Sequence, residues 1–524
     1  RADVFSREPD MTSNDEPSPA NPPHAPRDDL HRVLEARRAI LDAARPAAVA
    51  RQHARGRLTA REALAALADA GSFVEYGGLA RPAVGDLDGP ADGLVMGTAQ
   101  VGGRPVDLVL YDYTVQGGTQ SAINHIKMTR MFEHALRHRL PVICWLDGGG
   151  ARTHDMTVPA RGPTPTFVVF ARLSGVAPTI GIVPSRAFAG HANLAGMCDL
   201  LIAVRGSAMG LAGPPLVEAA LGVKLTPEEI GPADVHVRTG VIDLLADDDA
   251  HAADLARRYL SYFGPPAAPG PAPDPLPLRT LVPENPRRAY DVRKVVQHLA
   301  DVGSVLELKP GFGKSVVTAL VRFDGRAVGV VANQPLHLAG AIDSAASVKA
   351  ARFVQICDAY DLPLLLLCDT PGLLAGPEAE KTGLVRHSGR MLSAIANATT
   401  PMMTVVLRKA YGLGYYIMGS QPLDPAVLLA WPTAEYGGMG LEGAVSILHK
   451  RELEAIADPA ARAQRHRALT EQLKREHAAV EAAGKYVYDD VIDPADTRAL
   501  LLRTLATLPP APARTQRKRV IEPF

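Results

Sequence analysis

Cysteine, net charge and long apolar runs are all scarce in this sequence, and each scarcity argues against a class of protein. The 524 residues include 56 Lys plus Arg and 56 Asp plus Glu, so the formal charge is zero. A balanced charge argues against the basic surface of a nucleic-acid binder, and an apolar fraction of 47% argues against a chain that is disordered throughout. We therefore expect a globular protein that binds no nucleic acid.

The four cysteines lie among apolar neighbours, at spacings that match no zinc or redox motif. We expect them to be reduced core residues of a cytoplasmic protein, and we expect no metal site. They are Cys144, Cys198, Cys357 and Cys368.

The longest stretch without a charged residue covers residues 391–407 and contains Ser, Asn and three Thr. A helix that crosses a bilayer needs about 20 mainly apolar residues. This stretch is too short and too polar, so we expect no membrane-spanning helix and no membrane partner.

Composition divides the chain into segments. The N-terminus is rich in Pro, Asp, Ser and Asn and lacks an apolar signal core, with Met11 as a candidate natural start. Residues 264–277 contain seven prolines, which neither a helix nor a sheet ladder accommodates, so they predict a semi-rigid linker. The expected segments are a disordered leader (1–27), a helical arm (28–72), an N-terminal domain (73–263), a Pro-rich linker (264–284), a C-terminal domain (285–510) and a tail (511–524).

The regions on either side of the linker resemble each other at one constant offset, which carries Gly103 onto Gly325. Over residues 103–150 this repeat offset gives eleven identities without a gap, and it carries Lys127 to Lys349 and Asp147 to Asp369. Both copies read as strand, glycine-containing loop, helix, Leu-Pro, apolar strand, Asp and glycine loop. This alternation predicts an α/β protein built from two copies of one fold.

Two glycine loops that follow apolar strands are candidates for chemistry. They span residues 147–152 and 408–416. Glycines leave backbone N–H groups unobstructed, and such groups can stabilise a developing oxyanion. A tight turn without chemistry is the alternative for either loop taken singly, but two such loops in two similar halves favour a functional role.

Other candidate groups are weaker. His191 could act as a base, although a lone histidine among small residues is more often packed or capping. The pairs Glu435 with Glu442, or Glu228 with Glu229, could serve as acid and base, although surface or helix-start carboxylates are the commoner case. Lys127 and Lys349 occupy equivalent positions in the two halves, which favours a role in the fold.

Together these motifs resemble the carboxyltransferase (beta) subunit of biotin-dependent acyl-CoA carboxylases, of the propionyl-CoA and acetyl-CoA carboxylase type. The resemblance covers residues 28–510. The segments that carry it are His53–Glu62, Gly71–Glu75, Gly148–Arg152, Glu229–Pro232, Asp369–Gly372, Arg408–Gly412 and Ala430–Glu435.

The resemblance implies an α/β fold of two tandem crotonase-like (ClpP/crotonase) ββα-superhelix domains. It implies a homo-oligomer, from a dimer to a hexamer built as a trimer of dimers, with each site between the N-domain of one protomer and the C-domain of another. Acyl-CoA would bind the N-domain and carboxybiotin the C-domain. Carboxybiotin would release carbon dioxide, its ureido nitrogen would take the α-proton, and the resulting enolate would capture the carbon dioxide.

The resemblance also assigns site residues. The family's Ser-Gly-Gly-Ala-Arg loop falls on residues 148–152, so Gly149 and Gly150 would present N–H groups to the thioester enolate. The Tyr-Gly-Gly-Ala-Tyr loop falls on residues 411–415, so Leu413 and Gly414 would face the biotin ureido oxygen. The remaining cofactor-binding residues expected are Ala151, Arg152, Gly190, Tyr411, Gly412 and Tyr416.

Some residues depart from the family pattern. Leu413 replaces a glycine, which keeps the N–H and adds bulk beside the biotin path. Tyr416 fills a position that lines the acyl pocket in relatives, and Phe188–His191 stands where propionyl-type subunits have Cys-Ala-Gly-Gly. The chain therefore resembles a divergent branch of the family, and the acyl group of its substrate stays open.

Several expectations concern partners and activity. The sequence has no Ala-Met-Lys-Met segment and no ATP-grasp module, so biotin is expected on a separate carrier that works with a biotin carboxylase. A cluster of Arg55, Arg57 and Arg61 could meet the CoA phosphates. The main hypothesis is carboxyl transfer to the α-carbon of an acyl-CoA. The alternatives are a biotin-independent decarboxylase of a malonyl-type CoA, which needs the same enolate site, and a non-catalytic scaffold within a carboxylase.

Overall fold

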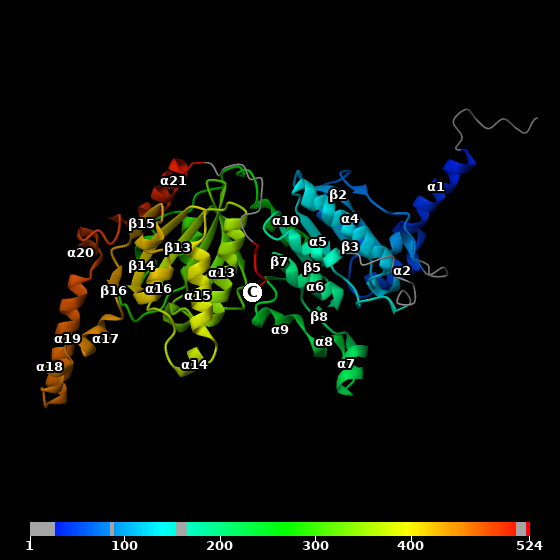
Figure 1. The fold of residues 1–524 in the computed structure, drawn as a ribbon. Coiled ribbons are helices and arrows are strands. Elements are labelled where there is room, and N and C mark those ends of the chain that lie inside the picture. The colour runs from blue at the N-terminus through cyan, green and yellow to red at the C-terminus, as the bar shows by residue number, and fades with distance from the viewer. Residues whose placement is uncertain (1–26, 84–88, 154–164, 510–519, 524) are drawn as a thin grey trace, which may run out of the picture.

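The computed structural model describes residues 27–83, 89–153, 165–509 and 520–523 (Figure 1). All but Arg27 of the predicted leader, and most of the predicted tail, lie outside the described residues. Within the described residues no helix is long and apolar enough to cross a membrane.

Two mixed sheets form the centre of the molecule and lie side by side in Figure 1. Each begins with antiparallel strands and continues with parallel ones. The first sheet, in spatial order, contains β1 (Val74–Glu75), β2 (Leu94–Val101), β3 (Arg104–Tyr111), β4 (Val142–Trp145), β5 (Thr179–Val183), β7 (Leu200–Val204) and β9 (Leu244–Ala246). The second contains β10 (Leu306–Leu308), β11 (Val316–Phe323), β12 (Arg326–Asn333), β13 (Leu364–Thr370), β14 (Met402–Tyr411), β15 (Val427–Ala430) and β17 (Asp490–Val491).

Short strands add to these sheets near the glycine loops. β6 (Arg186–Phe188) pairs with β8 (Ala208–Gly210), and β16 (Glu435–Gly437) pairs with the end of β14. The central strands are aliphatic and buried along their whole length, as parallel strands covered by helices on both faces require.

Helices cover both faces of both sheets. The first half contains α4 (Ala122–His138), α5 (Thr166–Arg172), α6 (Gly190–Met197), α7 (Pro214–Leu221), α8 (Pro227–Ile230), α9 (Ala233–Arg238) and α10 (Asp249–Ser261). The second contains α11 (Leu278–Leu281), α12 (Val292–Leu299), α13 (Ser344–Ala359), α14 (Pro377–Glu380), α15 (Leu384–Ala396), α16 (Gly412–Ile417), α17 (Leu441–Leu448), α18 (Lys450–Glu454), α19 (Pro459–Glu476), α20 (Ala479–Gly484) and α21 (Thr497–Thr507).

The structure repeats its elements at the repeat offset found in the sequence. This offset carries the first residues of β2, β3, α4 and β4 onto the first residues of β11, β12, α13 and β13. The two copies of one α/β fold are therefore confirmed.

The segment before the first sheet is helical. It contains α1 (Asp28–Ala39), α2 (Pro46–His53) and α3 (Ala60–Leu67). Thr59 and Glu62 form a capping box at the start of α3, which satisfies two N–H groups that the helix leaves without partners. Leu67 at its end is fully buried against the first sheet's core. The exact domain boundaries stay predictions.

Helices α10 and α13 lie in the layer between the sheets, and one hydrophobic core runs through both halves. Polar contacts join the halves as well, because Arg352 donates to the carbonyl oxygens of Cys198 and Asp199 and the Tyr360 hydroxyl donates to Asp199. Residues 520–523 cross this junction, near the C label in Figure 1, and their Ile521 is buried. The two halves thus form one body with the glycine loops in fixed positions.

Candidate active site

The first glycine loop begins where β4 ends and is held from both sides. The backbone N–H of Gln120 donates to the carbonyl oxygen of Gly150 at 2.8 Å, and the N–H of Arg152 donates to the carbonyl oxygen of Gln120 at 2.7 Å. Gly150 has φ of 102°, a conformation that side chains rarely adopt. No described residue accepts a hydrogen bond from its N–H, so this donor is available to a ligand.

Helix α6 begins beside this loop. A β-carbon built on Gly150 would lie 3.3 Å from the β-carbon of Ala189, the residue before the first helical residue Gly190. The first N–H groups of a helix have no acceptor within the helix. The start of α6 therefore lies beside Gly150, and backbone N–H groups at such a place can stabilise an oxyanion.

The two glycines expected to act as a pair differ in their surroundings. The N–H of Gly149 has an internal acceptor, the carbonyl oxygen of Gly117, at 3.3 Å. The free N–H of Gly150 therefore has the start of α6 at Gly190 as its neighbour, whereas the N–H of Gly149 is already hydrogen-bonded.

The side chain of Arg152 points into the protein. It is 3% exposed, and its guanidinium donates to Asp92 at 2.5 Å and to the carbonyl oxygen of Thr119. Its contribution within the described residues is to fix the loop. Ala151 at its side forms a bridge with Gln120, which is another loop-fixing contact.

Asp147, just before the glycines, is also fixed. Its carboxylate accepts hydrogen bonds from the hydroxyl of Ser185 at 2.9 Å and from the N–H of Arg186. Burial raises the pKa of Asp147 to about 6, against the effect of these donors.

His191 is fully buried beneath the loop. A β-carbon on Gly148 would lie 2.6 Å from its imidazole, and the ring meets Tyr111 edge-on at 4.3 Å between centroids. Burial lowers the pKa of His191 to about 4, and the nearby carbonyl groups of Phe188 and Gly118 offset only part of this. The ring is therefore neutral at physiological pH, as a packed histidine would be.

The second half repeats this geometry. Gly372, with φ of 128°, follows β13, and the N–H of Ile342 donates to its carbonyl oxygen at 3.1 Å. Helix α16 begins at Gly412, the residue onto which the repeat offset carries Gly190. A β-carbon on Gly414 would lie 2.6 Å from the Cα atom of Gly372, so this position accepts only glycine.

The remaining predicted residues of the second half surround this contact. Leu413 and Tyr416 are 62% and 38% exposed, so both present side chains at the surface next to the helix start. The hydroxyl of Tyr411 donates to Glu435 at 2.6 Å. Burial raises the pKa of Tyr411, and the nearby Glu435 carboxylate raises it further. A cavity of about 730 Å³ lies beside them and is lined by Tyr411, Glu435 and Lys409 among others.

Gly372 is a residue that we did not predict for the site. It occupies the position of Gly150 in the second copy, because the repeat offset carries one onto the other. The repeat alone could therefore have predicted Gly372. The family's glycine motif in the second half covers only residues 411–415, at the start of the helix.

The weaker candidates have structural partners. Lys127 donates to the carbonyl oxygens of Ala91 and Leu94, and Lys349 donates to those of Phe312 and Val316, which confirms their role in the fold. Glu229 belongs to the capping box of α8. The four cysteines are free and buried, as predicted. No cluster of three potential metal ligands occurs among the residues that the structure describes.

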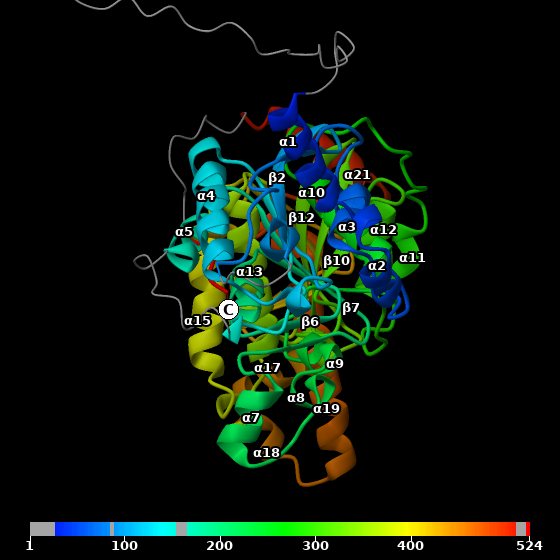
Figure 2. The same ribbon diagram turned by 90° about the vertical axis from the view of Figure 1, so that its right-hand side faces the viewer.

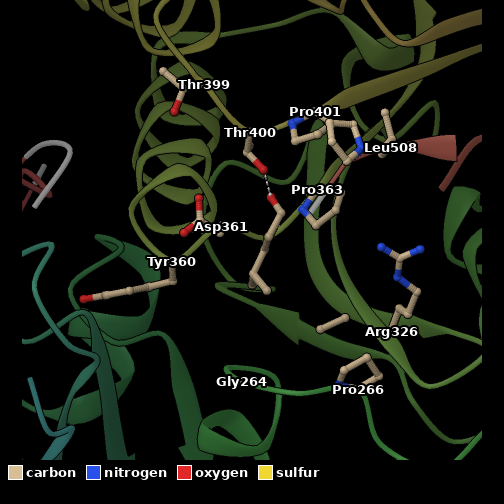
Figure 3. Close-up of a pocket in the computed structure, with 13 residues that line it drawn as sticks. Gly264, Pro266, Arg326, Tyr360, Asp361, Pro363, Thr399, Thr400, Pro401 and Leu508 are labelled. Carbon is tan, nitrogen blue, oxygen red and sulfur yellow. Dashed lines mark hydrogen bonds between the residues drawn. The ribbon is translucent and has the colours of Figure 1, made fainter. Parts of the chain in front are cut away.

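Two further cavities lie outside the glycine loops. One of about 320 Å³ is lined by Arg51, Arg55 and Arg186, together with Ala48, Gln52, Tyr113 and Thr114. Another of about 550 Å³ lies between the linker and the second sheet (Figure 3), where the hydroxyl of Thr400 donates to the carbonyl oxygen of Leu362. None of the residues lining this second cavity belongs to either glycine loop.

Comparison with known proteins finds close sequence relatives. The chain is 37% identical to the methylmalonyl-CoA carboxyltransferase 12S subunit of Propionibacterium freudenreichii over 87% of this chain and 90% of the relative. It is also 37% identical to the propionyl-CoA carboxylase beta chain of Roseobacter denitrificans over 87% of this chain and 92% of the relative.

Solved structures are similar to this chain as well, and they confirm the expected crotonase-like fold. A crystal structure of the transcarboxylase 12S hexamer, with methylmalonyl-CoA bound, superposes with a TM-score of 0.85 at 34% identity, covering 95% of this chain and 99% of that one. A single-chain, multi-domain long-chain acyl-CoA carboxylase superposes with a TM-score of 0.86 at 44% identity over 92% of this chain, which spans about half the length of that protein. The Carboxyl transferase domain family matches residues 51–521, and the chain belongs to this family.

Proposed function

We propose that this protein is the carboxyltransferase subunit of a biotin-dependent acyl-CoA carboxylase, which moves a carboxyl group from carboxybiotin to the α-carbon of an acyl-CoA. The observation that carries the proposal is the paired arrangement of the two halves. Each half sets a left-handed glycine, Gly150 or Gly372, against the start of a helix at Gly190 or Gly412. Two such sites suit a reaction in which two carbonyl oxygens gain negative charge.

On the acyl side, Gly150 and the start of α6 at Gly190 would donate to the thioester oxygen, with Gly149 beside them. On the biotin side, the N–H groups of Leu413 and Gly414 would donate to the ureido oxygen. Gly372 would pack against Gly414 and hold it in place. A well-placed backbone donor contributes roughly 3 kcal/mol to such a transition state. The chain's task is then to hold the reacting carbonyls and their donors in position.

The base is proposed to come from biotin itself, on a separate carrier. His191 is neutral and buried, and its ring nitrogens have no hydrogen-bond partner among the described residues. Tyr411 is committed to Glu435. These contacts favour positioning over side-chain acid–base catalysis.

The CoA phosphates would bind the arginine-lined cavity rather than the whole cluster expected from the sequence. Arg57 is paired with Asp249 and Arg61 with Glu75, so both are committed within the protein. Arg55 lies with Arg51 and Arg186 around the cavity, with its guanidinium over the ring of Tyr113. The cavity is joined to the glycine loop, because the N–H of Gly148 donates to the carbonyl oxygen of Arg186.

We predict that Arg55→Ala raises KM for acyl-CoA by about tenfold, the effect of one lost charge-assisted hydrogen bond, with little change in kcat. The same variant should leave KM for the acyl-pantetheine unchanged, because that substrate lacks the nucleotide phosphates. Steady-state kinetics with both substrates measure this. Arg137→Ala, at an exposed arginine of α4, serves as the control, and an equal rise in KM for both substrates would contradict the assignment.

The central experiment supplies the protein with a carboxylated biotin carrier and a panel of acyl-CoAs. Mass spectrometry should detect a carboxylated thioester. Gly150→Pro should lower the rate by at least about 100-fold, because proline removes the N–H and cannot adopt φ of 102°. Light scattering must report an unchanged assembly for the variant.

Two outcomes would count against carboxyl transfer. Carbon dioxide release from malonyl-CoA without biotin would favour the decarboxylase, and absence of product with every acyl-CoA would favour the scaffold. The relatives named above are carboxyltransferase and carboxylase subunits, which supports transfer and neither alternative.

A further inference from the structure

Gln120 lies between the two donors of the acyl-side site. Its backbone holds the glycine loop through Gly150 and Arg152, and its side chain is buried. The carboxamide oxygen Oε1 occupies the place that a side chain of Gly190 would need, because a β-carbon built on Gly190 would overlap it. The carboxamide therefore stands beside the first N–H groups of α6.

A buried polar chain orients this carboxamide from behind. Its Nε2 donates to the hydroxyl oxygen of Tyr111 at 3.1 Å, and that hydroxyl donates to the sulfur of Met128 at 3.1 Å. A thioether sulfur is a weak acceptor. If the carboxamide flips, so that its oxygen and nitrogen exchange places, the Tyr111 hydroxyl donates to Oε1 instead and Nε2 faces the helix start.

The second half shows that the fold does not need an amide here. The repeat offset places Ile342 at the position of Gln120, and Ile342 makes the same two backbone hydrogen bonds, to Gly372 at 3.1 Å and from Leu374 at 2.9 Å. Isoleucine thus supports a glycine loop as well as glutamine does. The carboxamide is an additional group that only the acyl-side half carries.

We propose that the Gln120 carboxamide is a catalytic side-chain donor to the thioester oxygen, alongside the backbone donors of Gly150 and α6. This inference rests on the proposed function. As the thioester oxygen gains negative charge it repels Oε1 and attracts Nε2, which turns the carboxamide toward the oxygen. Tyr111 then donates to Oε1, so both ends of the carboxamide are satisfied. No covalent bond forms or breaks at Gln120.

The test compares Gln120→Leu, Gln120→Glu and a control, Gln100→Leu, which makes the same chemical change at an exposed position of β2. Gln120→Leu should lower kcat by about 100- to 1,000-fold, the range for one lost oxyanion donor, with KM for acyl-CoA changed less than threefold. Gln100→Leu should match the wild type. Circular dichroism and light scattering check fold and assembly.

The pH dependence of kcat in Gln120→Glu distinguishes a donor role from a purely structural one. Its carboxylate repels the oxyanion at pH 8, while its protonated form donates an O–H, so kcat should recover by at least about tenfold relative to wild type as the pH falls toward 6. A Gln120→Leu enzyme within twofold of wild type, or a Gln120→Glu enzyme without recovery, overturns the inference and leaves the proposed function intact. Absence of turnover by the wild type overturns both.

Discussion

Burial sets the behaviour of single residues around the acyl-side loop more than their chemical type does. His191 would be partly charged near neutral pH in water, yet its side chain is fully buried beside Gly148 and Tyr111. Arg152 would be a natural anion ligand at the surface, yet it is buried against Asp92. Each of these two residues therefore supports the shape of the loop.

The buried imidazole should make stability depend on pH in a defined window. Because the pKa of His191 falls to about 4 in the folded state, against about 6.5 when unfolded, the unfolded state binds the extra proton between these values. The stabilisation is fully present above about pH 6.5 and is lost as the pH falls toward 4. Between pH 8 and pH 5 the wild type should lose about 2 kcal/mol more than His191→Gln.

Urea unfolding of both proteins at equal concentration measures this difference. The comparison cancels other titrating groups, among them Asp147, whose raised pKa acts in the opposite direction. Parallel pH profiles for the two proteins would mean that His191 is not neutral and buried as described.

At the scale of elements, the sequence predicted the repeat because strands, turns and N-caps constrain side chains. Ser121 and Asp343 both cap the helix that follows, and Lys127 and Lys349 both bind strand carbonyls. These requirements preserve residue types at a constant offset. The four buried cysteines were predictable because their apolar neighbours in the sequence are strand and helix residues of the core.

The sequence could not predict that each glycine loop lies beside a helix start. A backbone N–H group is present whatever the side chain, so its position leaves little trace in the residue type. Gly190 and Gly412 are equivalent helix starts, but the residues that follow them, His191 and Leu413, differ in size and polarity. The offset also lengthens after α6 and α16, so that α7, which begins at Pro214, corresponds to α17, which begins at Leu441. Only the three-dimensional structure aligns these elements.

At the scale of the whole molecule, α7 and α17 differ in what covers them. Both project from the same end of the molecule (Figures 1 and 2). Leu441 and Val445 of α17 are buried, and α17 packs on α19, whereas α7 has no buried residue. Leu216 and Leu221 of α7 are 63% and 69% exposed, next to Gly213, which approaches the carbonyl oxygen of Gly149.

The second half exposes large apolar side chains on α16, on α17 and between β16 and α17, namely Leu413, Tyr416, Met439, Ile447 and Leu448. Exposed apolar groups in this number indicate an interface. In a twofold dimer, α7 of one copy can cover this surface of the other, which would bring the acyl side of one protomer to the biotin side of its partner. The 12S relative is a hexamer in its crystal structure.

If two copies pair in this way, Leu221→Glu should separate them and lower the rate of carboxyl transfer together. A buried leucine contributes roughly 2 kcal/mol, it occurs twice in a twofold interface, and a buried unpaired carboxylate adds a further cost. We expect a shift to monomer in light scattering at micromolar concentration and a loss of activity of at least about tenfold. Val302→Glu, at an exposed valine outside α7, controls for the added charge. A monomeric Leu221→Glu protein with full activity would mean that one chain completes the site alone, and an unchanged dimer would place the interface elsewhere.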